Sequence, residues 1–150
     1  MVLATLAGCV VLLLAAGVVV ARRSLLVVTV CGGSMAPTYH DGDRVLVSRR
    51  RRPAAGMVVV LRQGDVAAEA AALAAHRSGY LVKRLAALPG DAVPAAVRPA
   101  LGTQSPDLVP EDAVVVLGDD ADSIDSRAWG FLPLRLVVGV VVADLRTAGR

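Results

Sequence analysis

Residues 80–91 read YLVKRLAALPGD, and this stretch indicates the fold class. Its first half is a short run of mainly apolar and aromatic residues, interrupted only by Lys83 and Arg84. Its second half ends in Pro89, Gly90 and Asp91, a combination that marks a turn. A short apolar run closed by Pro and Gly is typical of a buried β-strand rather than a helix.

Similar runs recur along the rest of the chain and are separated by Gly, Pro and Asp. They lie at residues 25–30, 44–47, 57–61, 113–117 and 136–142. Several short strands with turns between them predict a mainly β fold, a small antiparallel sheet, sandwich or barrel-like domain over residues 24–150. The Ala-rich segment 66–77 is also compatible with a short helix, and propensity alone does not decide.

The N-terminal segment 2–21 contains no charged residue. At about 1.5 Å per helical residue, a run of this length crosses a hydrocarbon core of roughly 30 Å. A cleaved secretory signal or a buried helix would be the alternatives. A secretory signal has a basic region before its apolar stretch, whereas here only Met1 precedes the run and Arg22 and Arg23 follow it. We therefore predict an uncleaved transmembrane anchor over residues 2–21, with the lipid bilayer as its partner.

Composition narrows the possible function classes. Hydrophobic residues make up 55% of the 150 residues, which fits a chain that lies partly in lipid. The net charge of +3 is modest, and the basic run 49–52 has no aromatic neighbours, so no nucleic-acid partner is predicted. Cys9 lies inside the apolar run and Cys31 beyond it, so the two cysteines do not suggest a disulfide framework.

Residues 32–38 read GGSMAPT and place Ser34 directly after two glycines. Gly32 and Gly33 permit a tight, exposed turn and leave room for a substrate backbone. Taken alone, this segment is better explained as an ordinary Gly-Ser loop. The Gly-x-Ser-x-Gly elbow of α/β-hydrolases does not fit, because Ala36 occupies the position of its second glycine.

Lys83 stands out because the chain uses arginine at all its other Lys or Arg positions. The chain has 16 basic residues, and Lys83 is the single lysine among them. Arginine stays protonated near neutral pH, whereas a lysine removed from water can lose its proton. The position of this lysine within an apolar strand pattern indicates a general base. A lysine on a solvated strand face is the alternative.

Residues 118–127 read GDDADSIDSR and carry four carboxylates. Their spacing does not match the calcium-binding loop of an EF-hand, and no metal site is predicted. Asp125 and Arg127 are two residues apart, so in an extended segment their side chains point the same way. We interpret them as a charge pair that fixes the loop.

Taken together, the three segments resemble the sequence boxes of type I signal peptidases, a family of Ser/Lys peptidases, and they occur in the family's order behind an apolar segment. The resemblance implies that Ser34 is the nucleophile and Lys83 its general base, with no cofactor. It also implies that Ser123 hydrogen-bonds the Lys83 amine while Asp125 and Arg127 hold the framework. Gly32 and Gly33 form the turn beside the oxyanion site, whose donor is mainly the Ser34 backbone N–H.

The family's biology is implied by the same resemblance. The substrates would be exported preproteins with leader peptides, and the protein would sit in a bacterial plasma membrane with its catalytic domain on the extracytoplasmic side. Arg22 and Arg23 argue against that orientation, because basic residues beside a span favour the cytoplasm. The short stretch between Asp91 and Asp112 indicates a minimal catalytic core, without the large second domain of some members. No partner subunit is identified.

One departure from the family pattern lies in the third segment, where Asp120 occupies a position that usually holds Asn. Two other functions share some of these features. A self-cleaving Ser/Lys repressor of the LexA type shares the catalytic logic but requires a DNA-binding unit where this chain has its apolar run. A non-catalytic membrane-anchored β scaffold would not need both Ser34 and the single lysine.

Overall fold

The computed structural model describes residues 22–63, 79–102 and 106–145, together with Cys9, Leu12, Ala15 and Gly17. The anchor predicted over residues 2–21 lies, apart from those four residues, outside this part, and so does the Ala-rich segment 66–77. Within the described residues, no helix is both long enough and apolar enough to cross a bilayer.

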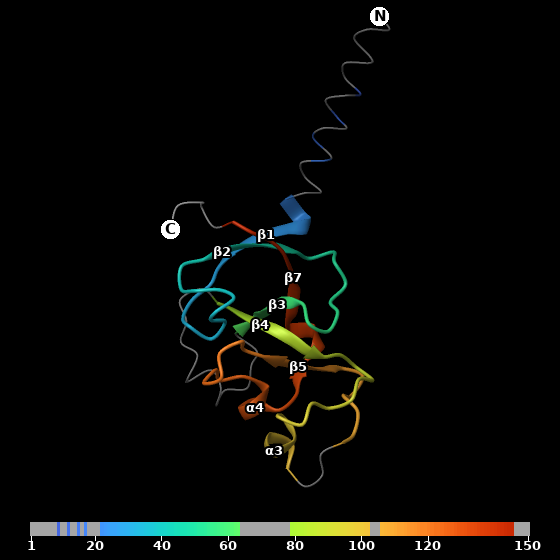
Figure 1. Cartoon of the computed structure of the whole chain (residues 1–150). Helices are drawn as coiled ribbons and strands as arrows, with labels where there is room; N and C mark the ends of the chain where they lie inside the picture. Colours follow the sequence, from blue (N-terminus) through green and yellow to red (C-terminus); the bar gives the residue numbers. More distant parts are fainter. Residues whose placement is uncertain are drawn as a thin grey trace, which may run out of the picture.

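The described chain forms one antiparallel sheet of seven strands that curls on itself (Figure 1). The prediction of a mainly β, antiparallel fold is confirmed. All six predicted strands are present, with ends displaced by at most two residues, and only the two-residue β6 was missed. The strands are β1 (Leu25–Thr29), β2 (Arg44–Ser48), β3 (Val58–Arg62), β4 (Tyr80–Ala87), β5 (Ala113–Leu117), β6 (Leu132–Pro133) and β7 (Val137–Asp144).

The strand order is β1-β2-β7-β3-β4-β5-β6, so the last strand of the chain joins the two halves of the sheet. On one side β7 pairs with β2, and on the other it pairs with β3. Both pairings contain a register shift, and such bulges bend a sheet. Gly139 makes the close approach possible, because a Cβ there would lie 2.6 Å from the Ser48 carbonyl oxygen.

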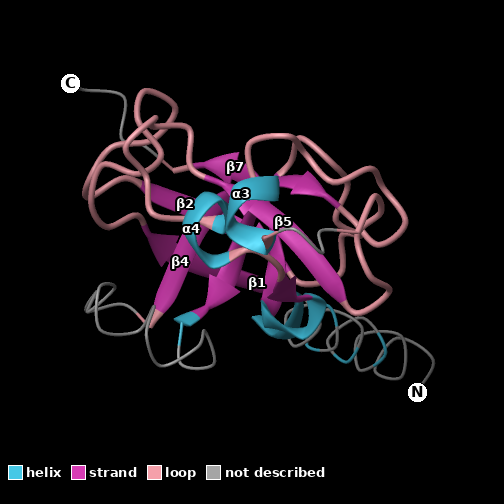
Figure 2. Ribbon diagram, turned by 90° about the horizontal axis from the view of Figure 1, so that it is seen from below, coloured by secondary structure: helices cyan, strands magenta, loops and turns pink. Residues whose placement is uncertain are grey.

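Strands β3 and β4 are buried on both faces, which explains why their sequences are continuous apolar runs. Val58, Val60 and Val82 belong to one apolar cluster. The alternate residues Leu61 and Leu81 belong to another. Three short helical segments accompany the sheet: α3 (Arg98–Leu101), α4 (Ser126–Trp129) and the 3₁₀ turn η2 (Leu134–Leu136). Figure 2 shows α3 and α4 lying next to each other.

Candidate active site

The loop after β1 holds Ser34 in a hydrogen-bonded turn. Gly32 has a positive φ of 80°, a conformation that favours glycine, and its N–H donates to Asp41 Oδ1 at 2.7 Å. The Tyr39 N–H donates to the Met35 carbonyl at 2.9 Å. Met35 is fully buried in the cluster formed by β1 to β4, so the residue next to Ser34 is anchored in the core.

A cavity of about 340 Å³ lies where this turn meets β4 and the loop after β5. Its walls combine polar groups with apolar side chains such as Val30 and Val82, and Trp129 of α4 contributes to them. The structure brings five of the predicted site residues together on this cavity: Gly32, Gly33, Ser34, Lys83 and Ser123.

Lys83 lies on the same face of β4 as the core residues Leu81 and Leu85, because strand side chains alternate. It is only 3% exposed. Its Nζ donates to Ser123 Oγ at 2.6 Å, as the resemblance implies, and lies 6.0 Å from the centre of the Trp129 ring.

Burial lowers the pKa of Lys83 from 10.5 to about 8, because desolvation disfavours the charged amine. The carboxylate of Asp125 opposes this shift, and the Arg127 guanidinium reinforces it. The sequence predicts that the adjacent Arg84 also lowers the pKa of Lys83. Its guanidinium is instead paired with Asp119, so the repelling charge comes from Arg127.

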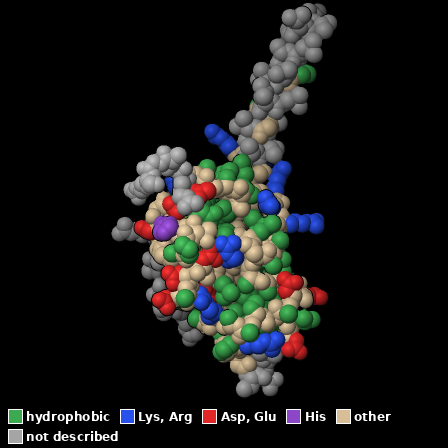
Figure 3. Space-filling view, viewed as in Figure 1, with side chains coloured by type: hydrophobic (Ala, Val, Ile, Leu, Met, Phe, Trp, Pro, Cys, Tyr) green, Lys and Arg blue, Asp and Glu red, His purple; other side chains and the backbone are tan. Residues whose placement is uncertain are grey.

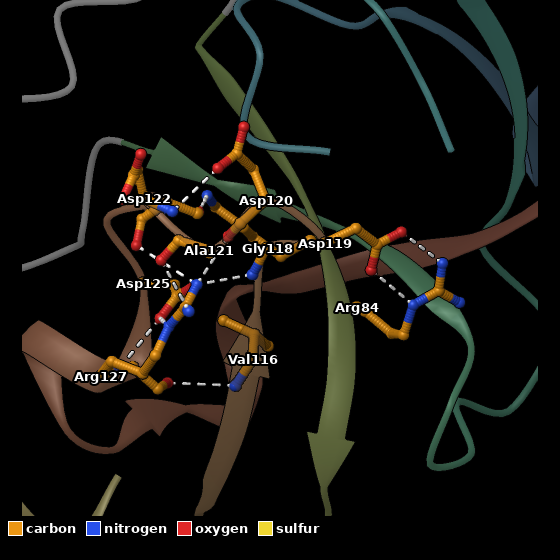
Figure 4. Close-up of polar contacts among 12 residues, drawn as sticks. Arg84, Val116, Gly118, Asp119, Asp120, Ala121, Asp122, Asp125 and Arg127 are labelled. Atoms are coloured by element: carbon orange, nitrogen blue, oxygen red, sulfur yellow. Dashed lines mark hydrogen bonds and ion pairs between the residues drawn. The ribbon is translucent and has the colours of Figure 1, made fainter. Parts of the chain in front are cut away.

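Asp125 and Arg127 tie the loop 118–127 together (Figure 4). Asp125 is fully buried and accepts hydrogen bonds from the Gly118 N–H at 2.7 Å and from Arg127 Nε at 3.0 Å. Arg127 also donates to the carbonyls of Ala121 and Asp120, each at 2.9 Å. Burial alone would raise the pKa of Asp125, but the hydrogen bonds from Arg127 and Gly118 bring that pKa below its usual value.

Gly118 has a role that sequence reasoning missed. A Cβ at this position would overlap both the Ser123 side chain and the Ser34 carbonyl oxygen. The Asp120 N–H donates to the same Ser34 carbonyl at 3.2 Å. Only a glycine therefore lets the loop carrying Ser123 pass directly behind Ser34. In the sequence, this role could have been inferred from the position of Gly118 at the end of an apolar run and directly before two aspartates.

A second polar network joins the elements of the site and was also missed. Arg84 binds both oxygens of Asp119, at 2.7 and 2.6 Å, and donates to the Gly56 carbonyl at 2.8 Å. Thr38 Oγ1 donates to the same Asp119 carboxylate. These contacts connect the Ser34 turn, β4, the turn before β3 and the loop after β5. We call this set of residues 38, 56, 84 and 119 the Asp119 clamp.

The chemistry available at the site is proton transfer beside a hydroxyl group. An amine with a pKa near 8 is partly neutral close to physiological pH and can accept a proton. Ser34 supplies a hydroxyl on the same cavity. Across the described residues, no group of three or more His, Cys, Asp or Glu side chains could hold a metal ion.

No curated protein gives a significant match to the chain. The model of a protein family described as signal peptidase, peptidase S26, matches residues 3–98 and 94–145. This match covers nearly the whole chain and confirms the resemblance to type I signal peptidases. Proteins of this family are serine peptidases of the signal-peptidase type and are typically membrane-associated. The chain therefore belongs to the signal peptidase family, peptidase S26.

Proposed function

We propose that this protein is a membrane-bound serine endopeptidase that removes leader peptides from exported preproteins, with Ser34 as nucleophile and Lys83 as general base. The observation that carries the proposal is the buried Lys83 amine, with its pKa lowered to about 8, on the cavity that Ser34 lines. The family match supports the same reaction class.

In the first half of the reaction, neutral Lys83 removes the proton from Ser34 Oγ as that oxygen attacks the scissile carbonyl. The tetrahedral intermediate carries its negative charge on the former carbonyl oxygen, and the Ser34 backbone N–H beside Gly33 donates a hydrogen bond to it. Collapse breaks the C–N bond. The protonated Lys83 amine then gives its proton to the leaving nitrogen, which leaves an acyl-enzyme ester on Ser34.

In the second half, Lys83 is neutral again and takes a proton from an incoming water molecule. The resulting hydroxide attacks the ester carbonyl, and Ser34 leaves with the proton that Lys83 returns. Ser123 orients the amine through its 2.6 Å hydrogen bond. Asp125 and Arg127 support the reaction indirectly, because they hold the loop from which Ser123 projects.

Membrane attachment is part of the proposal. A span over residues 2–21 would hold the catalytic domain at the bilayer on the extracytoplasmic side, where the apolar segment of a leader peptide also lies. Confining enzyme and substrate to one surface raises their effective concentration.

The test uses the full-length protein in detergent or lipid and a preprotein with a leader peptide, with cleavage followed by gel and mass spectrometry. Ser34→Ala and Lys83→Arg should each lower the cleavage rate by roughly 10³-fold or more, because neither variant can complete the proton transfer and acylation. Lys83→Arg keeps the positive charge but cannot become neutral.

Wild-type activity should rise with pH through an apparent pKa near 8, because the neutral amine is the reactive form. Circular dichroism checks that the variants are folded. A folded Lys83→Arg protein retaining more than about a tenth of the wild-type rate would remove Lys83 from the role of base.

A further inference from the structure

The cavity wall carries an excess of negative charge. Lys83, Asp120 and Asp122 are the charged residues among those described around it. In the proposed reaction, Lys83 must be neutral when substrate binds. The wall is then left with the two carboxylates of Asp120 and Asp122.

The other two carboxylates of this loop are already paired. Asp119 is bound by Arg84 and Asp125 by Arg127. No ion pair of the described residues includes Asp120 or Asp122. In Figure 4 their carboxylates lie on the opposite side of the loop from the Arg127 guanidinium.

Arg127 is the nearest basic residue that could neutralise the carboxylates of Asp120 and Asp122. Its hydrogen bonds show that its guanidinium is used elsewhere. Its guanidinium donates to both oxygens of Asp125 and to the loop carbonyls of residues 120 and 121. Arg127 is therefore engaged chiefly by the fully buried Asp125, and its attraction to Asp120 and Asp122 is weaker and acts through space. The backbone N–H of Asp122 donates to Asp120 Oδ1 at 2.8 Å, which fixes the two acidic residues relative to each other.

We propose that Asp120 and Asp122 determine substrate specificity, selecting preproteins that carry a Lys or Arg side chain close to the cleaved bond and disfavouring those with Asp or Glu there. This inference rests on the proposed function, because it takes the cavity as the substrate site.

The size of the effect follows from the exposure of the pair. Asp120 is half-buried and Asp122 is exposed. Partly exposed ion pairs contribute up to about 1 kcal/mol, so a basic side chain should raise kcat/KM by about fivefold over a neutral one. An acidic side chain at the same position should lower kcat/KM by a similar factor. Both effects should weaken at about 0.5 M salt, because salt screens exposed charges.

The experiment uses the full-length protein and a set of leader-peptide substrates that differ at one position. Each position flanking the cleaved bond is occupied in turn by Lys, Gln or Glu. The measured quantity is the ratio of kcat/KM between the Lys and Glu peptides, which does not depend on the amount of active enzyme. Wild type should prefer Lys over Glu by more than about tenfold at one or more positions.

The double variant Asp120→Asn/Asp122→Asn should bring that ratio close to one. The amide oxygen introduced at position 120 can still accept the hydrogen bond from the backbone N–H of residue 122, so the loop keeps its shape. Glu111→Gln/Asp112→Asn is the matched control. It removes the same charge from two exposed residues at the other end of β5 and should leave the ratio at its wild-type value.

The outcomes separate the two proposals. Wild type that cleaves the Lys, Gln and Glu peptides at equal rates at every position would overturn the specificity inference and leave the peptidase assignment intact. A preference that survives in the double variant would also overturn it. Cleavage of none of the peptides by the wild type would overturn the proposed function and the inference together.

Discussion

At the scale of single residues, burial of Lys83 bears on its proposed catalytic role and on the stability of the fold. Its pKa is depressed from 10.5 to about 8 in the folded protein, chiefly by burial. Between these two pH values the unfolded chain holds a proton that the folded chain has lost. Stability therefore rises with pH across this interval, and below pH 8 the folded state carries the full penalty of a buried charged amine. A shift of this size corresponds to about 3 kcal/mol.

Lys83→Met should therefore stabilise the protein while abolishing activity. We expect the free energy of unfolding at pH 7 to rise by about 2–3 kcal/mol, and this gain to shrink steadily between pH 8 and pH 10. The measurement is denaturant unfolding of wild type and variant in the same detergent at several pH values. Arg62→Met is the control, because Arg62 is exposed on the neighbouring strand. If the difference in the free energy of unfolding between wild type and Lys83→Met stayed constant across this pH range, the lowered pKa of Lys83 would be contradicted.

At the scale of elements, the Asp119 clamp joins the two elements that carry the proposed dyad. Ser34 lies on the turn after β1, and Lys83 lies on β4. The clamp joins these elements directly, through Thr38 on one side and Arg84 on the other. Hydrogen bonding from Arg84 lowers the pKa of Asp119, so its carboxylate stays charged in mildly acidic solution.

Asp119→Asn should weaken the clamp and reduce kcat by about 10- to 100-fold, since small displacements of reacting groups slow catalysis strongly. The loss of stability should be modest, because Arg84 is 35% exposed and can be hydrated. Steady-state kinetics with one preprotein substrate gives the comparison. Asp107→Asn is the matched control, because it breaks an exposed ion pair with Arg98 at 3.5 Å, outside the site. Equal kcat values for the two variants would exclude a positioning role for Asp119.

Sequence reasoning succeeded where a structural signal is local. The apolar runs predicted strands because β3 and β4 are buried on both faces. Pairing between distant segments left no such signal. The position of β7 between β2 and β3 depends on contacts between segments that are distant in the sequence. The same holds for the hydrogen bond from Thr38 to Asp119, which lies 81 residues further along the chain. For the same reason the sequence does not reveal the partner of Arg84: its neighbour in sequence is Lys83, but its partner in space is Asp119.

At the scale of the whole molecule, the structure sharpens the question of membrane orientation. The sequence showed Arg22 and Arg23 directly after the predicted span. The Arg49 N–H donates to the Ser24 carbonyl at 2.8 Å, which brings the exposed arginines 49–52 to the same place. On the face seen in Figure 3, basic side chains lie near the point where the chain enters β1. Six arginines beside the predicted span would favour the cytoplasmic side, whereas the proposed cleavage of exported preproteins requires the opposite side.

We expect the domain to lie outside the cytoplasm despite these arginines, because the proposed reaction requires access to exported preproteins. Protease added to spheroplasts should digest the domain after Ser24 while a cytoplasmic marker protein survives. Immunoblotting against a C-terminal tag gives the readout. A domain protected until the membrane is permeabilised would place it inside and would leave it without access to translocated preproteins.

Trp129 gives the molecule an optical property that is useful at its proposed catalytic centre. It is the single tryptophan of the chain, and its ring lines the cavity 6.0 Å from Lys83 Nζ. Indole emission can be excited apart from that of tyrosine and responds to nearby charge and to water. The intrinsic fluorescence of the protein therefore reports from this one place. Protonation of the amine and arrival of a peptide can both be followed in the unlabelled protein, without any turnover.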